Sequence, residues 1–282
     1  MATSEVKQLP KQSAQITLNI PWSEIEKSYD IVLERIAKSS EIAGFRKGKA
    51  PKKIVEQKVD KNKLYEEVIK DVVPKVYTEA LKQHNLTPVL SPKIEMTSAK
   101  QNQDWVVTVT VALKPKVTLK DYKSNIKKVK EGKAKIWVPG QSANEDKEKK
   151  PSLDEILNAL FEGIEVEMSD LILDNEVNRL LADLIDQTKK LGLTVEQYLL
   201  AKGKTVETLK VDYRKQAQKS LAIEFALSQI ADTENITVSA KDLEDVIAKV
   251  EDAKEKEKLV KESYYLAHMI RQQKTLDFLA NL

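Results

Sequence analysis

Proline divides this sequence into two parts of different character. All nine prolines lie at or before Pro151, and residues 152–282 contain none. Only three glycines, at positions 163, 192 and 203, follow Pro151. Because proline and glycine are the residues that interrupt helices, a stretch this long and this poor in both favours helix throughout. With 282 residues the chain is also about twice the size of a typical domain, so we expect two domains.

Charge separates the same two parts. Residues 1–115 hold 19 basic and 14 acidic residues, residues 116–150 hold 11 and 5, and residues 151–282 hold 17 and 25. The net charge of +3 therefore conceals a basic first half and an acidic second half. Such opposition indicates that the first half meets a polyanion, although a run of surface lysines is as often simply solvated.

Composition excludes several kinds of chemistry. The chain has no cysteine and only two histidines, His84 and His268, so we expect no catalytic residues, no metal site and no cofactor. The first fifteen residues lack the apolar core of a signal peptide, and the most apolar window, residues 105–113, is too short to span a bilayer. We therefore expect a soluble, cytoplasmic protein that is not an enzyme and does not contact membranes.

Residues 1–115 predict an α+β domain with helices on a small antiparallel sheet. Ile16, Leu18 and Ile20 alternate with polar residues, as in a half-buried strand, and two further strands are predicted at 93–99 and 105–113. Between the strands, three helices are predicted to begin at residues suited to a helix start: Ser23, Pro51 and Asp60. The third of them should be kinked at Pro74.

Residues 151–282 predict an all-α domain with long helical arms. Ser152-x-x-Glu155 and Thr194-x-x-Gln197 have the capping-box pattern that begins a helix, and further helices are predicted after Ser169, over about 205–231, after Ser239 and over about 256–280. Four aromatic residues are expected in the cores of these helices more often than at a binding surface: Tyr198, Tyr213, Phe225 and Tyr264.

One basic loop stands out between the first two predicted helices. Residues 42–55 contain five basic residues and no acidic one. The loop includes two of the seven glycines, which permit a tight turn, and Arg46 provides a planar fork for carboxylate or phosphate. Phe45 is either a buried anchor for the loop or an apolar plug for a partner. A plain structural role and a binding role are about equally favoured for such a turn.

The residues of this loop, GFRKGKAP (44–51), resemble the signature of the bacterial trigger factors, a family of ribosome-associated chaperones. The resemblance extends over residues 1–115, including ITLNI (16–20) and PWSEIEKSY (21–29), and on through VTLKDYK (117–123). It resumes at IEVEMSDLILDNEVNRLL (164–181) and continues as a helical pattern to the end.

This resemblance implies a function and a site. It implies that the N-terminal domain docks on the large ribosomal subunit beside the exit tunnel, with Phe45, Arg46 and Lys47 against a rim protein and ribosomal RNA. Gly44 and Gly48 would shape the loop, and we assign Lys49 to the same ribosome-binding surface. The helical part would form a concave cradle that holds nascent or unfolded polypeptides without ATP. The oligomeric state stays open, including a homodimer away from the ribosome.

One domain of the family has no counterpart in this sequence. Members of the family usually have a prolyl isomerase domain between the two parts, whereas residues 124–150 are mostly lysine and polar residues with Trp137 as the sole aromatic. We therefore expect a ribosome-binding domain over 1–115, a basic linker over 116–150 with a short strand at 134–138, and a helical client-binding domain over 151–282. The chain should have no isomerase activity.

One alternative belongs to another class of protein. The basic loop and linker could bind nucleic acid while the helices dimerise, which would make the protein an RNA-binding helical adaptor. That class would place aromatic residues at the spacing that stacks successive bases, and such residues are absent around the basic segments. The chaperone hypothesis is therefore preferred.

Overall fold

The structure is a computed structural model, and it describes residues 2–39, 45–46, 48–49, 51–134, 151–250 and 252–282. The chain divides into two compact units. The first consists of Met1–Lys114 with Met168–Ile172, and the second of Pro115–Glu167 with Leu173–Leu282.

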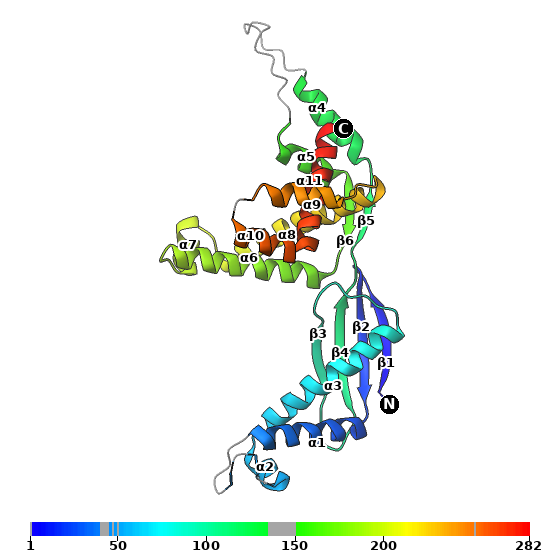
Figure 1. The fold of residues 1–282 in the computed structure, drawn as a ribbon, viewed down its shortest axis with the longest axis vertical. Helices are drawn as coiled ribbons and strands as arrows, with labels where there is room; N and C mark the ends of the chain where they lie inside the picture. The colour runs from blue at the N-terminus through cyan, green and yellow to red at the C-terminus, as the bar shows by residue number, and fades with distance from the viewer. Residues whose placement is uncertain (1, 40–44, 47, 50, 135–150, 251) are drawn as a thin grey trace. The chain divides into compact units, whose positions relative to one another are not determined.

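The first unit is a four-stranded antiparallel sheet with three helices (Figure 1). Its strands are β1 (Thr3–Leu9), β2 (Ser13–Ile20), β3 (Lys93–Ser98) and β4 (Trp105–Ala112), in the spatial order β1-β2-β4-β3. The helices are α1 (Trp22–Ser39), α2 (Lys52–Lys58) and α3 (Lys61–Gln83), and α3 crosses one face of the sheet. The predicted α+β class is confirmed, and β1 is an additional strand.

The core of this unit lies between the helices and the central strands. Ile16 pairs with Val109 and Leu18 pairs with Val107, and all four side chains are fully buried. Thr17 alternates with them and is only half-buried, as the strand periodicity predicts. Each buried aliphatic side chain stabilises the fold by about 1.5–3 kcal/mol, so this alternation decides which face the helices cover.

The predicted helix starts are partly right. The carboxylate of Asp60 accepts a hydrogen bond from the Asn62 amide at 2.9 Å, as a helix cap does, and α3 runs without interruption through Pro74. The start of α1 differs from the prediction at Ser23. Its first residue is Trp22, whose amide donates to Asp104 Oδ1 at 2.9 Å, so a residue distant in sequence caps this helix.

The second unit is mostly helical, as predicted, and has one short two-stranded ribbon (Figure 1). The ribbon consists of β5 (Lys116–Leu119) and β6 (Ile164–Glu167). The helices are α4 (Tyr122–Ala134), α5 (Leu153–Glu162), α6 (Asp170–Lys190), α7 (Val195–Lys202), α8 (Val206–Thr233), α9 (Ala240–Ala248), α10 (Ala253–Lys261) and α11 (Ser263–Asn281). One buried cluster joins α4, α5, α8 and α11 through Ile126, Leu160, Ile230 and Leu279.

Local signals in this unit agree with the structure at most helix starts. Ser152, Thr194 and Ser239 form capping boxes with the residues three positions later. The single helix predicted over 256–280 is instead two helices, because α10 ends at Lys261 and α11 begins at Ser263.

The interval 116–150, expected to be a linker, begins with regular structure. Strand β5 and helix α4 occupy it up to Ala134, and the buried side chains of Tyr122 and Ile126 belong to the core of the second unit. A helical fragment that starts at residue 151 would lose this packing and the partner of β6. The strand predicted at 134–138 lies outside the described residues apart from Ala134, which ends α4, and Trp137 lies outside them as well.

We predict that Gly163→Ala lowers the free energy of unfolding of the second unit. A Cβ at Gly163 would stand 2.5 Å from the Tyr122 Cα, where the Lys120 amide donates to the Gly163 carbonyl at 2.9 Å. Such overpacking costs about 1–3 kcal/mol. The control is Gly132→Ala in α4, where a Cβ meets no atom within 4 Å and alanine should stabilise slightly. Urea unfolding followed by circular dichroism compares them, and equal midpoints would contradict the prediction.

Candidate functional site

The basic loop, residues 44–49, connects α1 to the short helix α2 in the first unit. The structure describes Phe45, Arg46, Gly48 and Lys49, while Gly44 and Lys47 lie outside the described residues. The loop follows the C-terminal end of α1. Pro51, which directly precedes α2, comes after it.

A tight turn forms the tip of this loop. The Lys49 amide donates to the Arg46 carbonyl at 2.9 Å, which closes a four-residue turn. Gly48, its third residue, has φ +72°, in the left-handed region that favours glycine. A Cβ there would stand 2.8 Å from the carbonyl oxygen of Lys38 in α1. The turn thus depends on glycine both for its backbone conformation and for its close approach to α1.

The described residues of the turn present one apolar and two cationic groups to solvent. Phe45 is 40% exposed, and Arg46 and Lys49 are exposed. Neither of these two cations makes an ion pair with any residue that the structure describes. The interpretation of Phe45 as a buried anchor is therefore less favoured than the interpretation as an apolar contact for a partner. A half-exposed aromatic ring beside free cations can contact both an apolar surface and carboxylates or phosphates.

Two lysines balance the negative charge of Glu34, a residue of α1 near the basic loop. Its carboxylate lies 3.3 Å from Lys38 Nζ in α1 and 3.3 Å from Lys52 Nζ in α2. Hydrogen bonds to Lys52 and then to Lys38 lower the pKa of Glu34. Because both lysines compensate this carboxylate, it does not cancel the positive charge of the loop.

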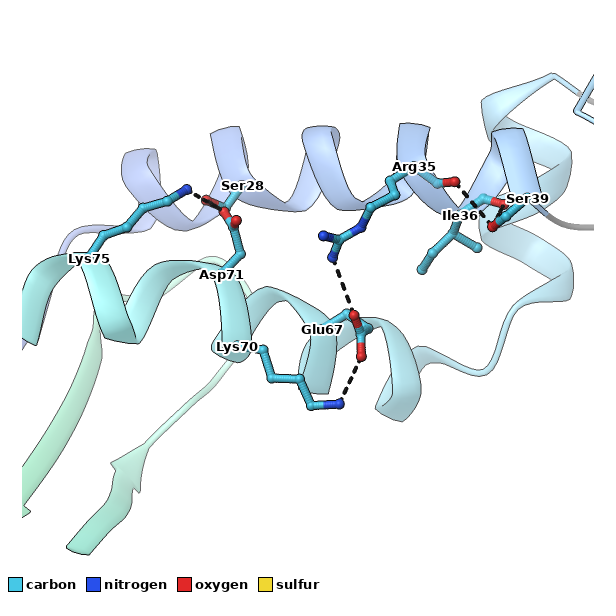
Figure 2. A network of polar contacts seen from close by, with 8 residues as sticks. All are labelled: Ser28, Arg35, Ile36, Ser39, Glu67, Lys70, Asp71 and Lys75. Carbon is cyan, nitrogen blue, oxygen red and sulfur yellow. Dashed lines mark hydrogen bonds and ion pairs between the residues drawn. The ribbon is translucent and has the colours of Figure 1, made fainter. Parts of the chain in front are cut away.

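A polar network fixes the C-terminal half of α1 to α3 (Figure 2). Arg35 donates to Glu67 at 3.2 Å, and the hydroxyl of Ser39 donates to the Arg35 and Ile36 carbonyls at the end of the helix. About two turns further from the loop, Ser28 donates to Asp71 at 2.9 Å. These contacts hold the helix from which the loop begins.

The second unit has an apolar groove between α5, α8 and α11. The groove has a volume of about 450 Å³. Its apolar lining consists of Leu157, Ile223, Leu227, Tyr265, Met269 and Leu276. Tyr265 and Met269 are 61% and 50% exposed, so apolar surface faces solvent at the groove.

This groove was not predicted from the sequence. Tyr264 was expected in a core, and its side chain is 91% exposed, whereas Tyr198, Tyr213 and Phe225 are half-buried. No local pattern separates Tyr264 and Tyr265 from core residues, since adjacent helix residues such as Val72 and Val73 are both buried in one core.

Two classes of site are absent from the described parts of the chain. No group of three or more histidine, aspartate or glutamate side chains is placed there to hold a metal ion. Among the same residues, no helix is long and apolar enough to cross a membrane.

Comparison with known proteins gives matches along the whole chain. Residues 1–136 match the family model "Bacterial trigger factor protein (TF)", and residues 128–281 match "Bacterial trigger factor protein (TF) C-terminus". A trigger factor of Mycolicibacterium smegmatis is 34% identical over 121 residues, which are 43% of this chain and 26% of that protein. A trigger factor of Streptococcus pneumoniae is 39% identical over 109 residues, which are 39% of this chain and 26% of that protein.

The aligned part thus spans about a quarter of the length of these relatives. A solved structure from work on "Promiscuous Substrate Recognition in Folding and Assembly Activities of the Trigger Factor Chaperone" has the same fold, with a TM-score of 0.67. It is 16% identical in sequence, and the match covers 98% of this chain and 99% of that one.

We predict that Gly48→Ala opens the turn of the basic loop without unfolding the unit. The new Cβ would clash with the Lys38 carbonyl, so the hydrogen bond from Lys49 to Arg46 should weaken and the Lys49 amide should exchange faster with solvent. Gly192→Ala is the matched control, because Gly192 also has a positive φ of +69° but its Cβ would meet no atom within 4 Å. An unchanged Lys49 exchange rate in Gly48→Ala would refute the role of this glycine.

Proposed function

This chain belongs to the bacterial trigger factor family, and on that premise we propose that it is an ATP-independent chaperone that docks on the large ribosomal subunit. It uses the basic loop for docking at the exit tunnel and the apolar groove of the second unit to hold nascent or unfolded chains. The observation on which docking rests is the exposed turn that combines Phe45 with uncompensated cations.

Charge supports this assignment of docking to the first unit. Residues 1–115 have a surplus of basic residues, and the basic loop has no acidic residue of its own. Long-range attraction would steer this unit to ribosomal RNA, and the planar guanidinium of Arg46 would then fix its register on a phosphate or a rim carboxylate.

The second unit is suited to holding clients weakly. An apolar groove with solvent-exposed Tyr265 and Met269 can shield an apolar segment of an unfolded chain. Methionine adapts its shape to different partners, which suits a client set without a common sequence. The surplus of acidic residues in 151–282 disfavours contact between these helices and ribosomal RNA, whereas residues 116–150 of the same unit are basic.

No nucleotide is required in this proposal. None of the seven glycines is spaced as in the phosphate-binding loop of ATPases, and holding by surface contact needs no energy input. The two family matches overlap over residues 128–136, which leaves no interval for a prolyl isomerase domain. We therefore assign the chain no isomerase activity.

We predict that replacing Phe45, Arg46 and Lys47 together by alanine abolishes ribosome co-sedimentation while the helix content stays unchanged. The substitution removes the apolar contact and two cations of the loop. Wild-type binding should also weaken as salt rises, because counterions screen the charge pairs.

The matched control for this triple variant is Lys61→Ala with Lys63→Ala. Both lysines are exposed at the beginning of α3, so this variant loses the same number of positive charges and leaves the loop intact. It should retain most ribosome binding. Equal losses in the two variants would mean that net charge alone drives the association, as expected for a general RNA-binding protein.

We predict that Tyr265→Ser with Met269→Ser weakens suppression of aggregation of a denatured model protein. Both side chains are exposed at the apolar groove, so their removal should leave stability nearly unchanged while apolar contact area for the client is lost. Ribosome co-sedimentation should be unaffected. The control is Ile31→Ser with Val89→Ser, two exposed apolar residues of the first unit. If that control reduced holding equally, the groove would have no special role.

A further inference from the structure

A row of three aromatic side chains runs through the first unit from the sheet to α1. The Tyr65 ring in α3 lies 5.9 Å from that of Trp105 in β4, and the Tyr29 ring in α1 lies 5.8 Å from that of Tyr65. The rings are tilted by 55° and 49°, a geometry that aromatic pairs favour. Trp105 is only 1% exposed, so one end of the row is fixed in the core.

The other end of the row contacts α2. The hydroxyl of Tyr29 donates a hydrogen bond to Glu56 Oε1 at 2.8 Å. Burial and then the hydrogen bond to Glu56 raise the pKa of Tyr29 well above its ordinary value. The hydroxyl therefore remains protonated, and able to donate, throughout the physiological pH range.

Helix α2 needs such a contact because it has little else to hold it. It has only seven residues, too few for a stable isolated helix, and Val55 is its one buried residue. The ion pair between Lys52 and Glu34 joins it to α1, but both side chains are about half exposed, and such surface pairs contribute little.

We propose that Tyr29 and Glu56 are positioning residues for the basic loop. The loop begins at the end of α1 and ends where α2 begins, so a hydrogen bond that ties α2 to α1 sets the separation of its two ends. Phe45 and Arg46 are then presented in one conformation, and less ordering remains to be done on docking. The consequence for ribosome binding rests on the proposed function; the consequence for α2 does not.

The first test removes the hydroxyl only. Tyr29→Phe keeps the ring against Tyr65 and should weaken ribosome binding between about two- and tenfold, the range expected for one hydrogen bond. Tyr65→Phe is the matched control. It makes the same chemical change in the same row, and the Tyr65 hydroxyl makes no hydrogen bond to any described residue, so binding should stay at the wild-type level. Equal losses in both variants would overturn the proposal.

The acceptor provides a second comparison. Glu56→Gln and Glu56→Ala remove the same negative charge, but only glutamine keeps a side-chain oxygen that can accept from Tyr29. Glu56→Gln should bind ribosomes at least as tightly as wild type, and Glu56→Ala should bind more weakly than Glu56→Gln. If the two variants bound equally, the hydrogen bond would have no positioning role.

A measurement without ribosomes separates this proposal from the docking proposal. The chain has no cysteine, so spin labels can be attached at Lys53→Cys in α2 and Lys82→Cys in α3 without competing thiols. The distance distribution between the labels should broaden or shift in Tyr29→Phe and remain as in wild type in Tyr65→Phe. An unchanged distribution in Tyr29→Phe would overturn the proposal. If wild type failed to bind ribosomes, docking would be wrong, and this distance alone would decide whether Tyr29 positions α2.

Discussion

The pairing of β2 with β4 is the interaction on which the position of the basic loop depends. It places Ile16 opposite Val109 and Leu18 opposite Val107, and the resulting apolar face is the surface on which the helices of the first unit pack. Trp105, at the beginning of β4, starts the aromatic row that reaches α1 and α2. An exposed loop is thus held in place by contacts that begin in the centre of the sheet.

Much of the fold could be predicted because its signals are local. Capping boxes at Ser152, Thr194 and Ser239 begin helices where predicted, and alternating residues gave β2 and β4. Strand β1 was missed because only two of its residues, Val6 and Leu9, are apolar, and because its turn uses Lys11 and Gln12 at positive φ instead of glycine. The pair β5 and β6 was missed because its partners, Val117 and Val166, are far apart in the chain.

The candidate site also combines features that adjacent residues predict with features that only tertiary contacts create. The composition of the basic loop and the need for Gly48 follow from adjacent residues, so the sequence was sufficient to identify them. The contacts that hold α2, above all Tyr29 with Glu56, join separate helices, and no periodicity indicates them. The apolar groove is also a tertiary feature, since its walls come from α5, α8 and α11.

Helices α4 and α5 bring two points that are separated in the chain to the same core of the second unit. They follow β5 and precede β6, which pair antiparallel, and Ile126 and Leu160 join the two helices in one buried cluster. The chain therefore leaves this buried cluster along α4 and returns to it along α5. Closing a longer loop between such points costs only about 0.6 kcal/mol for each doubling of its length. The packing of the core that flanks residues 134 and 151 therefore sets little limit on the length of chain that joins them.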